Sequence, residues 1–445
     1  MRKLTLTAAA LAMGAVPAYA ADLPVAPEPV DYVQICDAYG DGYFFIPGTE
    51  TCLRIRGRVR AEYRWNDFGD APNNWDRRTL NDTSTRARGY LRMDARTQTE
   101  YGLLRAYIDM FATVDTPTFS ANSNARPSTV VDRPSNDNNV GSFGSAGGTS
   151  LTLDYAFVQF GGLTVGKAKS FYDFWTGYAY GAITTVAYSD DNPWVAGYTA
   201  DFGNGFSASL AFEDRSFRQQ GLYVGSYLYP QPAGGPAYSQ GYGGHRWPNI
   251  VGNIRVDQGW GSAQLMGAVQ EVRYLSSVAS GEVGWAIGAG VELDFSNFLS
   301  GTFFALQGGY ANGALGYIHS DWGATVFDAT DIFPTGLVGE STRNQSGTSE
   351  GWSIAGGFYT EWTPEFNSAL QLSYAEADNK NFYDFDQFDL NAKVGWTPVS
   401  GFEIGTELGY RNISFDNAVS PGGSTLTTPS DNDIITVLIR VQRDF

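Results

Sequence analysis

Arginines at alternate positions give one short segment of the chain its distinctive chemistry. The members of this row, which one glutamate interrupts, are Arg54, Arg56, Arg58, Arg60, Glu62 and Arg64. Successive side chains of a β-strand point to opposite faces, so a strand here would place the whole row on one face. Guanidinium groups stay protonated at any relevant pH, so this face would carry a fixed positive charge. Such a face would act on ions and dipoles by electrostatics. The row therefore predicts a surface in contact with water rather than a dry core.

The residues between the arginines predict the nature of the opposite face. They are mostly apolar: Ile55, Gly57, Val59, Ala61 and Tyr63. Water on one face and lipid on the other is the pattern of strands in an outer-membrane β-barrel.

Residues that could support catalysis or bind a metal are few. The chain has 2 histidines, His245 and His319, which lie far apart and outside motifs such as HExxH. We interpret both as exposed loop residues without oriented partners. The acidic stretch 378–389 lacks the spacing of an EF-hand, so we interpret it as solvated loop charge. The sequence therefore predicts no enzyme activity, no catalytic residue, no metal and no cofactor.

The beginning of the chain predicts export from the cytoplasm. Arg2 and Lys3 precede an apolar run that ends at Ala18-Tyr19-Ala20, which is typical of a signal peptide over residues 1–20. Cys36 and Cys52 then enclose 15 residues, and one disulfide between them is the expectation for an exported chain. Closing so short a loop contributes roughly 3 kcal/mol. A metal or redox site is the alternative, but no histidine or further cysteine lies nearby.

The alternating pattern recurs along the chain, which carries a formal net charge of −18. Further arginines fall on the predicted wet face of the next two strands at Arg86, Arg88, Arg92, Arg96 and Arg105. Short connections alternate with long, polar, glycine-rich ones, seven and eight in number, which predicts sixteen strands. We therefore expect an all-β fold, a sixteen-stranded antiparallel transmembrane β-barrel with short periplasmic turns and long external loops. A periplasmic leader over 21–52 would precede the barrel at 53–445.

Aromatic residues next to the short turns support the barrel over a soluble β-sandwich. These residues are Trp260, Phe298, Trp362, Trp396, Phe402 and Phe445. Amphipathic rings prefer the membrane interface, so we interpret them as one girdle. A sandwich would bury its apolar faces against a second sheet and would not need a row of arginines on the other face.

The segment 32–60 (YVQICDAYGDGYFFIPGTETCLRIRGRVR) resembles the opening of the alphaproteobacterial general porin family. The last residues, Val441 to Phe445, are similar to the end of that family, although Arg443 replaces the usual apolar residue. The resemblance implies that Phe445 is the signal read by the barrel-assembly machinery. It also implies an outer-membrane homotrimer in a Gram-negative cell, in contact with lipids and lipopolysaccharide, through which small hydrophilic solutes diffuse passively.

The resemblance further implies that the third external loop, at about 170–193, folds into the lumen. Acids on this loop, Asp173, Asp190 and Asp191, would then face the arginines across the pore and create a transverse field. The residues that we predict at the constriction wall are Arg54, Arg56, Arg58, Arg60, Arg88, Arg92, Arg96 and Arg105. We expect weak ion selectivity from this arrangement.

Alternatives remain at both levels of the prediction. Arginines near strand ends, such as Arg64 and Arg86, could instead bind loops, lipopolysaccharide phosphates or lumen carboxylates. The three acids could lie on the outer flank of their loop. For the whole protein, the alternatives are a substrate-specific channel, for example for sugars, and an adhesin carried on the barrel. A binding patch for nucleic acid is not expected.

Overall fold

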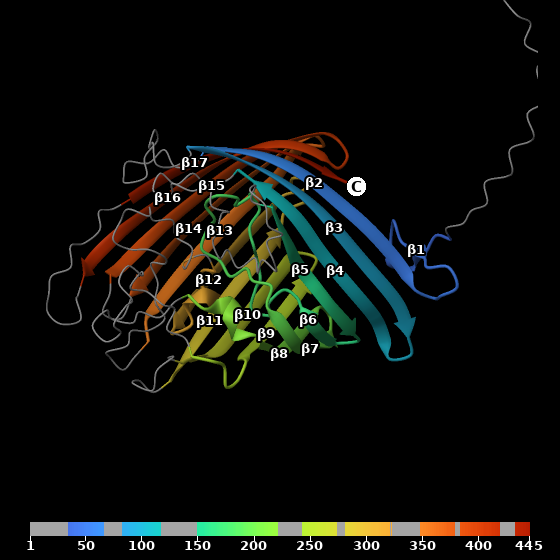
Figure 1. Ribbon diagram of the computed structural model, residues 1–445, viewed down its shortest axis with the longest axis horizontal. Coiled ribbons are helices and arrows are strands. Elements are labelled where there is room, and N and C mark those ends of the chain that lie inside the picture. The colour runs from blue at the N-terminus through green and yellow to red at the C-terminus, as the bar shows by residue number, and fades with distance from the viewer. Residues whose placement is uncertain are drawn as a thin grey trace, which may run out of the picture.

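The computed structural model describes residues 34–65, 82–116, 149–220, 243–273, 281–320, 322, 348–378, 383–418 and 432–445. Within these ranges the chain forms a closed antiparallel β-barrel of 16 strands, β2 to β17 (Figure 1). Each strand pairs with its sequence neighbours, and β17 closes the ring by pairing with β2 from Val437↔Trp65 to Asp444↔Arg58. This architecture confirms the predicted fold. No helix in the described ranges is long and apolar enough to cross a membrane.

The strands have the following bounds. The first half of the barrel comprises β2 (Cys52–Trp65), β3 (Thr83–Thr99), β4 (Gly102–Asp115), β5 (Thr149–Phe160), β6 (Leu163–Lys167), β7 (Trp194–Gly203), β8 (Phe206–Glu213) and β9 (Asn249–Gln258). The second half comprises β10 (Gly261–Val272), β11 (Glu282–Asp294), β12 (Phe303–Asn312), β13 (Glu350–Thr363), β14 (Phe366–Asp378), β15 (Tyr383–Val399), β16 (Phe402–Ala418) and β17 (Asn432–Asp444). The remaining elements are β1 (Phe44–Phe45) and the 3₁₀ helices η1 (Asp37–Tyr39), η2 (Arg215–Arg218) and η3 (Leu315–Tyr317).

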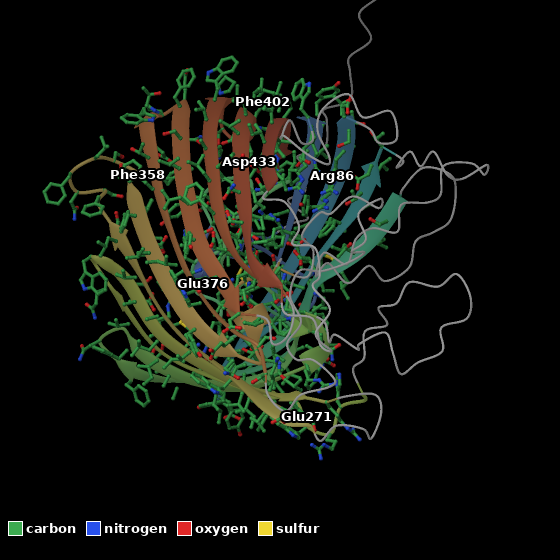
Figure 2. The ribbon with its side chains drawn as sticks, turned by 90° about the vertical axis from the view of Figure 1, so that its left-hand side faces the viewer. Arg86, Glu271, Phe358, Glu376, Phe402 and Asp433 are labelled. Atoms are coloured by element: carbon green, nitrogen blue, oxygen red, sulfur yellow. A yellow bond between two sulfur atoms is a disulfide. The ribbon has the colours of Figure 1, made fainter. Side chains whose placement is uncertain are left out.

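Polarity is inverted relative to a water-soluble protein. On β2, Ile55 and Val59 expose 51% and 55% of their surface, whereas Glu62 exposes 4%. The alternating sequence pattern explains this inversion, because apolar side chains point out of the barrel and polar ones point in. Side chains project from both faces of the strands in Figure 2, where Phe402 lies at one rim. Of the predicted girdle, Trp260, Phe298, Trp362, Trp396 and Phe445 are exposed.

The short turns follow from local backbone chemistry. Asn204 and Gly205, which join β7 to β8, have φ angles of 50° and 75°. Positive φ at both central residues is the geometry of a type I′ hairpin turn, which asparagine and glycine favour. The other short connections also lie where the sequence predicted them, for example between Thr99 and Gly102 and between Phe160 and Leu163.

The hydrophobic core lies inside the barrel, because the connection between β6 and β7 folds into it. This segment, residues 168–193, is called L3 below, and it runs through the interior in Figure 1. Its buried residues Tyr172, Trp175 and Val186 pack against inward-facing residues such as Ala286 and Ala305. The predicted inward fold of the third loop is therefore present.

Candidate functional site

Strands β2, β3 and β4 together form an arginine-rich inner wall. We use the name arginine wall for the eight predicted residues, which are Arg54, Arg56, Arg58 and Arg60 on β2, Arg88, Arg92 and Arg96 on β3, and Arg105 on β4. The strand register places Arg56 opposite Arg92, and Arg60 opposite Arg88. Like charges directly opposite each other destabilise a sheet, so these pairs need counter-charges or solvent.

Asp94 supplies the counter-charge at the short-turn end of the wall. Its carboxylate lies 2.8 Å from Arg96, 2.9 Å from Arg105 and 3.8 Å from Arg54. It also accepts a hydrogen bond of 2.8 Å from the Tyr43 hydroxyl. Three arginines of the wall are thus held around one buried carboxylate.

The disulfide loop before β2 contributes to this arginine cluster through Tyr43. A disulfide joins Cys36 to Cys52 with a Cα–Cα distance of 5.9 Å, which confirms the predicted bond. Both cysteines are buried with Tyr43, whose ring centroid lies 4.4 Å from the Arg54 guanidinium carbon. Burial raises the pKa of Tyr43, and its hydrogen bond to Asp94 raises that pKa further. The disulfide loop, residues 36–52, therefore packs against the inner wall.

Further along the wall, most arginines have their own acidic partner. Arg92 lies 2.6 Å from Asp109, and Arg58 lies 2.5 Å from Asp444. Arg60 lies 3.2 Å from Glu62.

Glu62 also joins the wall to the last strand. It pairs with Arg64, and it lies 2.7 Å from Arg440 on β17. Arg86, near its strand end, lies 2.6 Å from Asp115. Pairing with a lumen carboxylate is one of the alternatives to a pore role that the sequence left open for this arginine.

Two members of the wall differ from this pattern. Arg88 donates a 2.8 Å hydrogen bond to Thr113 and lies over the ring of Phe111. Arg56 is exposed to the lumen and makes no hydrogen bond or ion pair with the part of the chain that the structure describes. Among the described residues it is therefore a wall cation without a bound acid.

L3 packs against the side of the barrel opposite the arginine wall. Inward-facing polar groups of strands β8 to β17 line that side. Glu213 accepts a 2.8 Å hydrogen bond from the amide of Phe171, and Gln371 accepts one of 2.9 Å from Tyr178. Glu407 accepts one of 3.0 Å from Gly181. Side chains of the barrel thus satisfy the backbone donors of a segment that has no regular secondary structure.

Aromatic residues of L3 fit against inward-facing glycines. A Cβ at Gly290 would collide with the ring of Phe174, and a Cβ at Gly357 would collide with Trp175. A Cβ at Gly288 would lie 2.8 Å from the Tyr172 hydroxyl. The glycines of these strands therefore leave room for L3.

Two of the three predicted loop acids are buried in an ion-pair cluster. Arg218 on η2 lies 2.8 Å from Asp173 and 2.8 Å from Asp191, and all three side chains are fully buried. Burial lowers the pKa of Arg218, but Asp191 and Asp173 outweigh it and raise that pKa overall. Asp190 is exposed, and its amide donates to Ser320. Asp190 is thus exposed beside two acids that are buried against Arg218. The opposition of the three acids to the arginine wall stays a prediction.

Three further cations of the barrel interior, Arg218, Arg255 and Arg440, were not predicted from the sequence. Arg440 and Arg255 could have been found, because each alternates with apolar neighbours such as Ile439 and Ile254. Arg218 falls in a predicted long loop, and no periodicity pointed to it. The interpretation of His319 as an exposed residue was wrong. Its side chain is buried beside Trp322, because the chain from η3 packs into the barrel.

The terminal residue Phe445 lies at the closure of the barrel. Its backbone amide donates a 3.0 Å hydrogen bond to Gly57, and the amide of Gly57 donates one of 2.8 Å in return. A Cβ at Gly57 would collide with the Phe445 ring. The ring therefore occupies a gap in the outward face of β2, where it remains 72% exposed.

A cavity of about 700 Å³ lies between the arginine wall and the beginning of L3. The wall contributes Arg54, Arg56, Arg92 and Arg105, and L3 contributes Lys169 and Asp173. Tyr107, Tyr155 and Phe157 form an aromatic flank, and Arg255 and Asn253 close the cavity on β9. The arrangement can bind or steer charged solutes. The described residues also contain no group of three or more acids, histidines or cysteines that could hold a metal.

Comparisons with known proteins agree with this architecture. A family model described as the Porin subfamily matches residues 22–437. Porin Omp2b of Brucella abortus (strain 2308) is 28% identical over 453 residues, covering 100% of this chain and 99% of the relative. Porin Omp2b of Brucella neotomae is 30% identical over 388 residues, covering 84% of this chain and 92% of the relative.

A solved structure gives the same fold at lower sequence similarity. The outer membrane channel DcaP of Acinetobacter baumannii matches with a TM-score of 0.62 and 14% identity, covering 90% of this chain and 99% of that chain. At this identity the similarity concerns the fold alone.

Proposed function

We propose that this chain, which belongs to the Porin subfamily, filters the ions and solutes in its channel between the arginine wall and L3. Family membership implies an outer-membrane channel rather than an enzyme. The observation that supports the proposed filter best is the partition of the lumen. Wet arginines line β2 to β4, whereas L3 is packed against β8 to β17.

The proposed roles of the arginines follow from their partners. Arg54, Arg96 and Arg105 form a fixed cationic cluster around Asp94 near the short turns. Arg56, Arg58, Arg60, Arg88 and Arg92 supply the positive side of the filter further along the wall. On the opposite side we assign the larger part to Asp190, because its side chain is exposed whereas those of Asp173 and Asp191 are buried against Arg218.

We also propose a homotrimer with lipid and lipopolysaccharide around its outer surface, as the resemblance implies. The exposed apolar side chains on β2, such as Ile55 and Val59, support contact with lipid. Phe445 is proposed as the residue that the barrel-assembly machinery reads, and its exposed ring at the barrel closure supports this role. Residues 1–20 are proposed as the signal peptide, and these lie outside the described residues.

Conductance and liposome swelling test the proposed channel together. In planar bilayers the purified protein should give discrete conductance steps that increase linearly with salt concentration. Liposomes containing it should swell at rates that fall steadily with the size of an added neutral sugar. Swelling that saturates with one sugar alone would instead favour a substrate-specific channel, and an absence of conductance steps would contradict the proposal.

A further inference from the structure

The cavity between the arginine wall and L3 has more cationic than anionic groups. Six cations line it, namely Arg54, Arg56, Arg92, Arg105, Lys169 and Arg255. The acids that line it are Asp94, Asp109 and Asp173. Each of these acids already pairs with an arginine, through Arg96 and Arg105, Arg92 and Arg218 respectively. The lining acids are therefore committed to partners, and the excess charge is positive.

Two cations of the cavity carry this excess. Arg56 makes no hydrogen bond or ion pair with the described ranges, and the strand register places it opposite Arg92. Lys169 lies in L3, and its Nζ makes one 3.5 Å contact, to the carbonyl of Phe174, among those same residues. Both side chains line the cavity, so one cation approaches from the barrel wall and the other from L3.

The flank of the cavity is apolar and aromatic. The ring centroids of Tyr107 and Phe157 lie 5.3 Å apart, and those of Tyr107 and Tyr155 lie 6.1 Å apart. Aromatic side chains in such clusters offer faces and edges on which another ring can pack. A solute that used both features would need an anionic group and a flat apolar body. The volume of about 700 Å³ is sufficient for such a molecule.

We propose that this cavity is a binding subsite for small aromatic carboxylates on their way through the channel. The planar guanidinium of Arg56 suits a carboxylate in a two-point contact, and Lys169 adds a second positive charge. The aromatic flank receives the ring of the solute. This proposal rests on the proposed channel function and adds to it a preferred class of solute.

Benzoate block in planar bilayers tests the subsite. Benzoate should reduce the single-channel current in a saturable manner, whereas benzyl alcohol, with the ring but no charge, and acetate, with the charge but no ring, should block much less. Arg56→Gln should raise the half-blocking concentration of benzoate roughly tenfold, because a charge-assisted contact is lost. Lys169→Gln, which alters L3 rather than a strand, should raise that concentration roughly threefold.

Arg88→Gln is the matched control, because it removes one wall charge outside the cavity. It should change the half-blocking concentration by less than about twofold, as expected for a charge that does not contact the solute. Equal effects of Arg88→Gln and Arg56→Gln would overturn the subsite in favour of a general field. Equal block by benzoate and acetate, or by benzoate and phosphate, would overturn the aromatic preference. A channel that conducts without saturable block contradicts this inference alone, whereas loss of all conductance contradicts the proposed function.

Discussion

Arginine–carboxylate pairs occur in two regions of this barrel, and their surroundings give them different roles. In the arginine wall, the Arg92 side chain keeps 28% of its surface exposed beside Asp109. In the cluster that holds L3, the side chains of Arg218 and Asp173 are fully buried. Exposed pairs contribute little to stability because water screens them, whereas breaking a buried pair leaves an uncompensated charge in a dry site. The first region can therefore act on passing ions, and the second fixes the position of L3.

The largest expected effect comes from breaking the buried cluster at Arg218. Arg218→Met removes the partner of Asp173 and Asp191 and should destabilise the packing of L3 by about 3–5 kcal/mol. Amide hydrogen exchange of peptides from L3 should become much faster, and single-channel recordings should become noisier. Arg218 also lies over the ring of Tyr317, so exchange near η3 should increase as well.

Removing the acids along with the arginine sharpens this test. In Arg218→Met combined with Asp173→Asn and Asp191→Asn, the two acids that pair with Arg218 lose their charge as well, so much of the protection of L3 should return. If the combined variant exchanges as fast as Arg218→Met alone, the burial of unpaired charge does not explain the effect.

A smaller effect is expected from filling the space beneath an L3 aromatic ring. Gly357→Ala places a Cβ against Trp175 and should cost about 1–3 kcal/mol in L3 packing. The control is Gly89→Ala, because a Cβ at Gly89 would have no atom within 4 Å. Hydrogen exchange of L3 should increase in the first variant and stay unchanged in the second. Unchanged exchange in both would remove the glycines from the docking of L3.

Acidification should loosen the same region through His319. Burial lowers the pKa of this histidine well below 6.5, and Arg411, which lies 2.5 Å from Asp389, lowers it further. An unfolded histidine titrates near 6.5, so below that pH the unfolded segment binds more protons than the folded one. Packing around His319 should then lose up to about 1.4 kcal/mol per pH unit until the folded pKa is reached.

Hydrogen exchange of residues 315–320 at pH 7.5 and pH 5 measures this effect. Exchange rates, corrected for the intrinsic effect of pH, should rise at the lower pH in the natural protein. His319→Gln, which cannot titrate, should abolish the rise. A variant with the same pH dependence as the natural protein would exclude His319 as its cause.

Much of the fold could be predicted because the residues of a barrel strand alternate between apolar ones that face lipid and polar ones that face the lumen. The apolar Ile55 and Val59 point outward and the arginines between them point inward, as the period of two requires. The turn at Asn204-Gly205 could be predicted from the local preference of these two residues for positive φ. The disulfide could be predicted because Cys36 and Cys52 are the only cysteines of the chain.

Less of the candidate site could be predicted from the sequence, because the residues that contact each other there are distant along the chain. Arg218 meets Asp173 and Asp191 through the folded path of L3, and nothing in their spacing indicates the contact. The segment 283–293 contains many small residues. Its Gly288 and Gly290 face inward and accommodate Tyr172 and Phe174. A pattern of glycines indicates that a neighbouring group packs closely against the strand, but it does not identify the segment that does so.

We propose above that arginines facing the lumen determine ion selectivity, independently of the total charge of the protein. The reversal potential of single channels in a salt gradient tests it most directly, with Arg56, Arg58 and Arg60 all changed to Gln. A matched variant changes Arg246, Arg273 and Arg443 to Gln, which removes the same charge from positions outside the arginine wall, at strand ends and in loops. We expect a shift towards cation selectivity in the first variant and little shift in the second. Equal shifts in both variants, or none in the first, would contradict it.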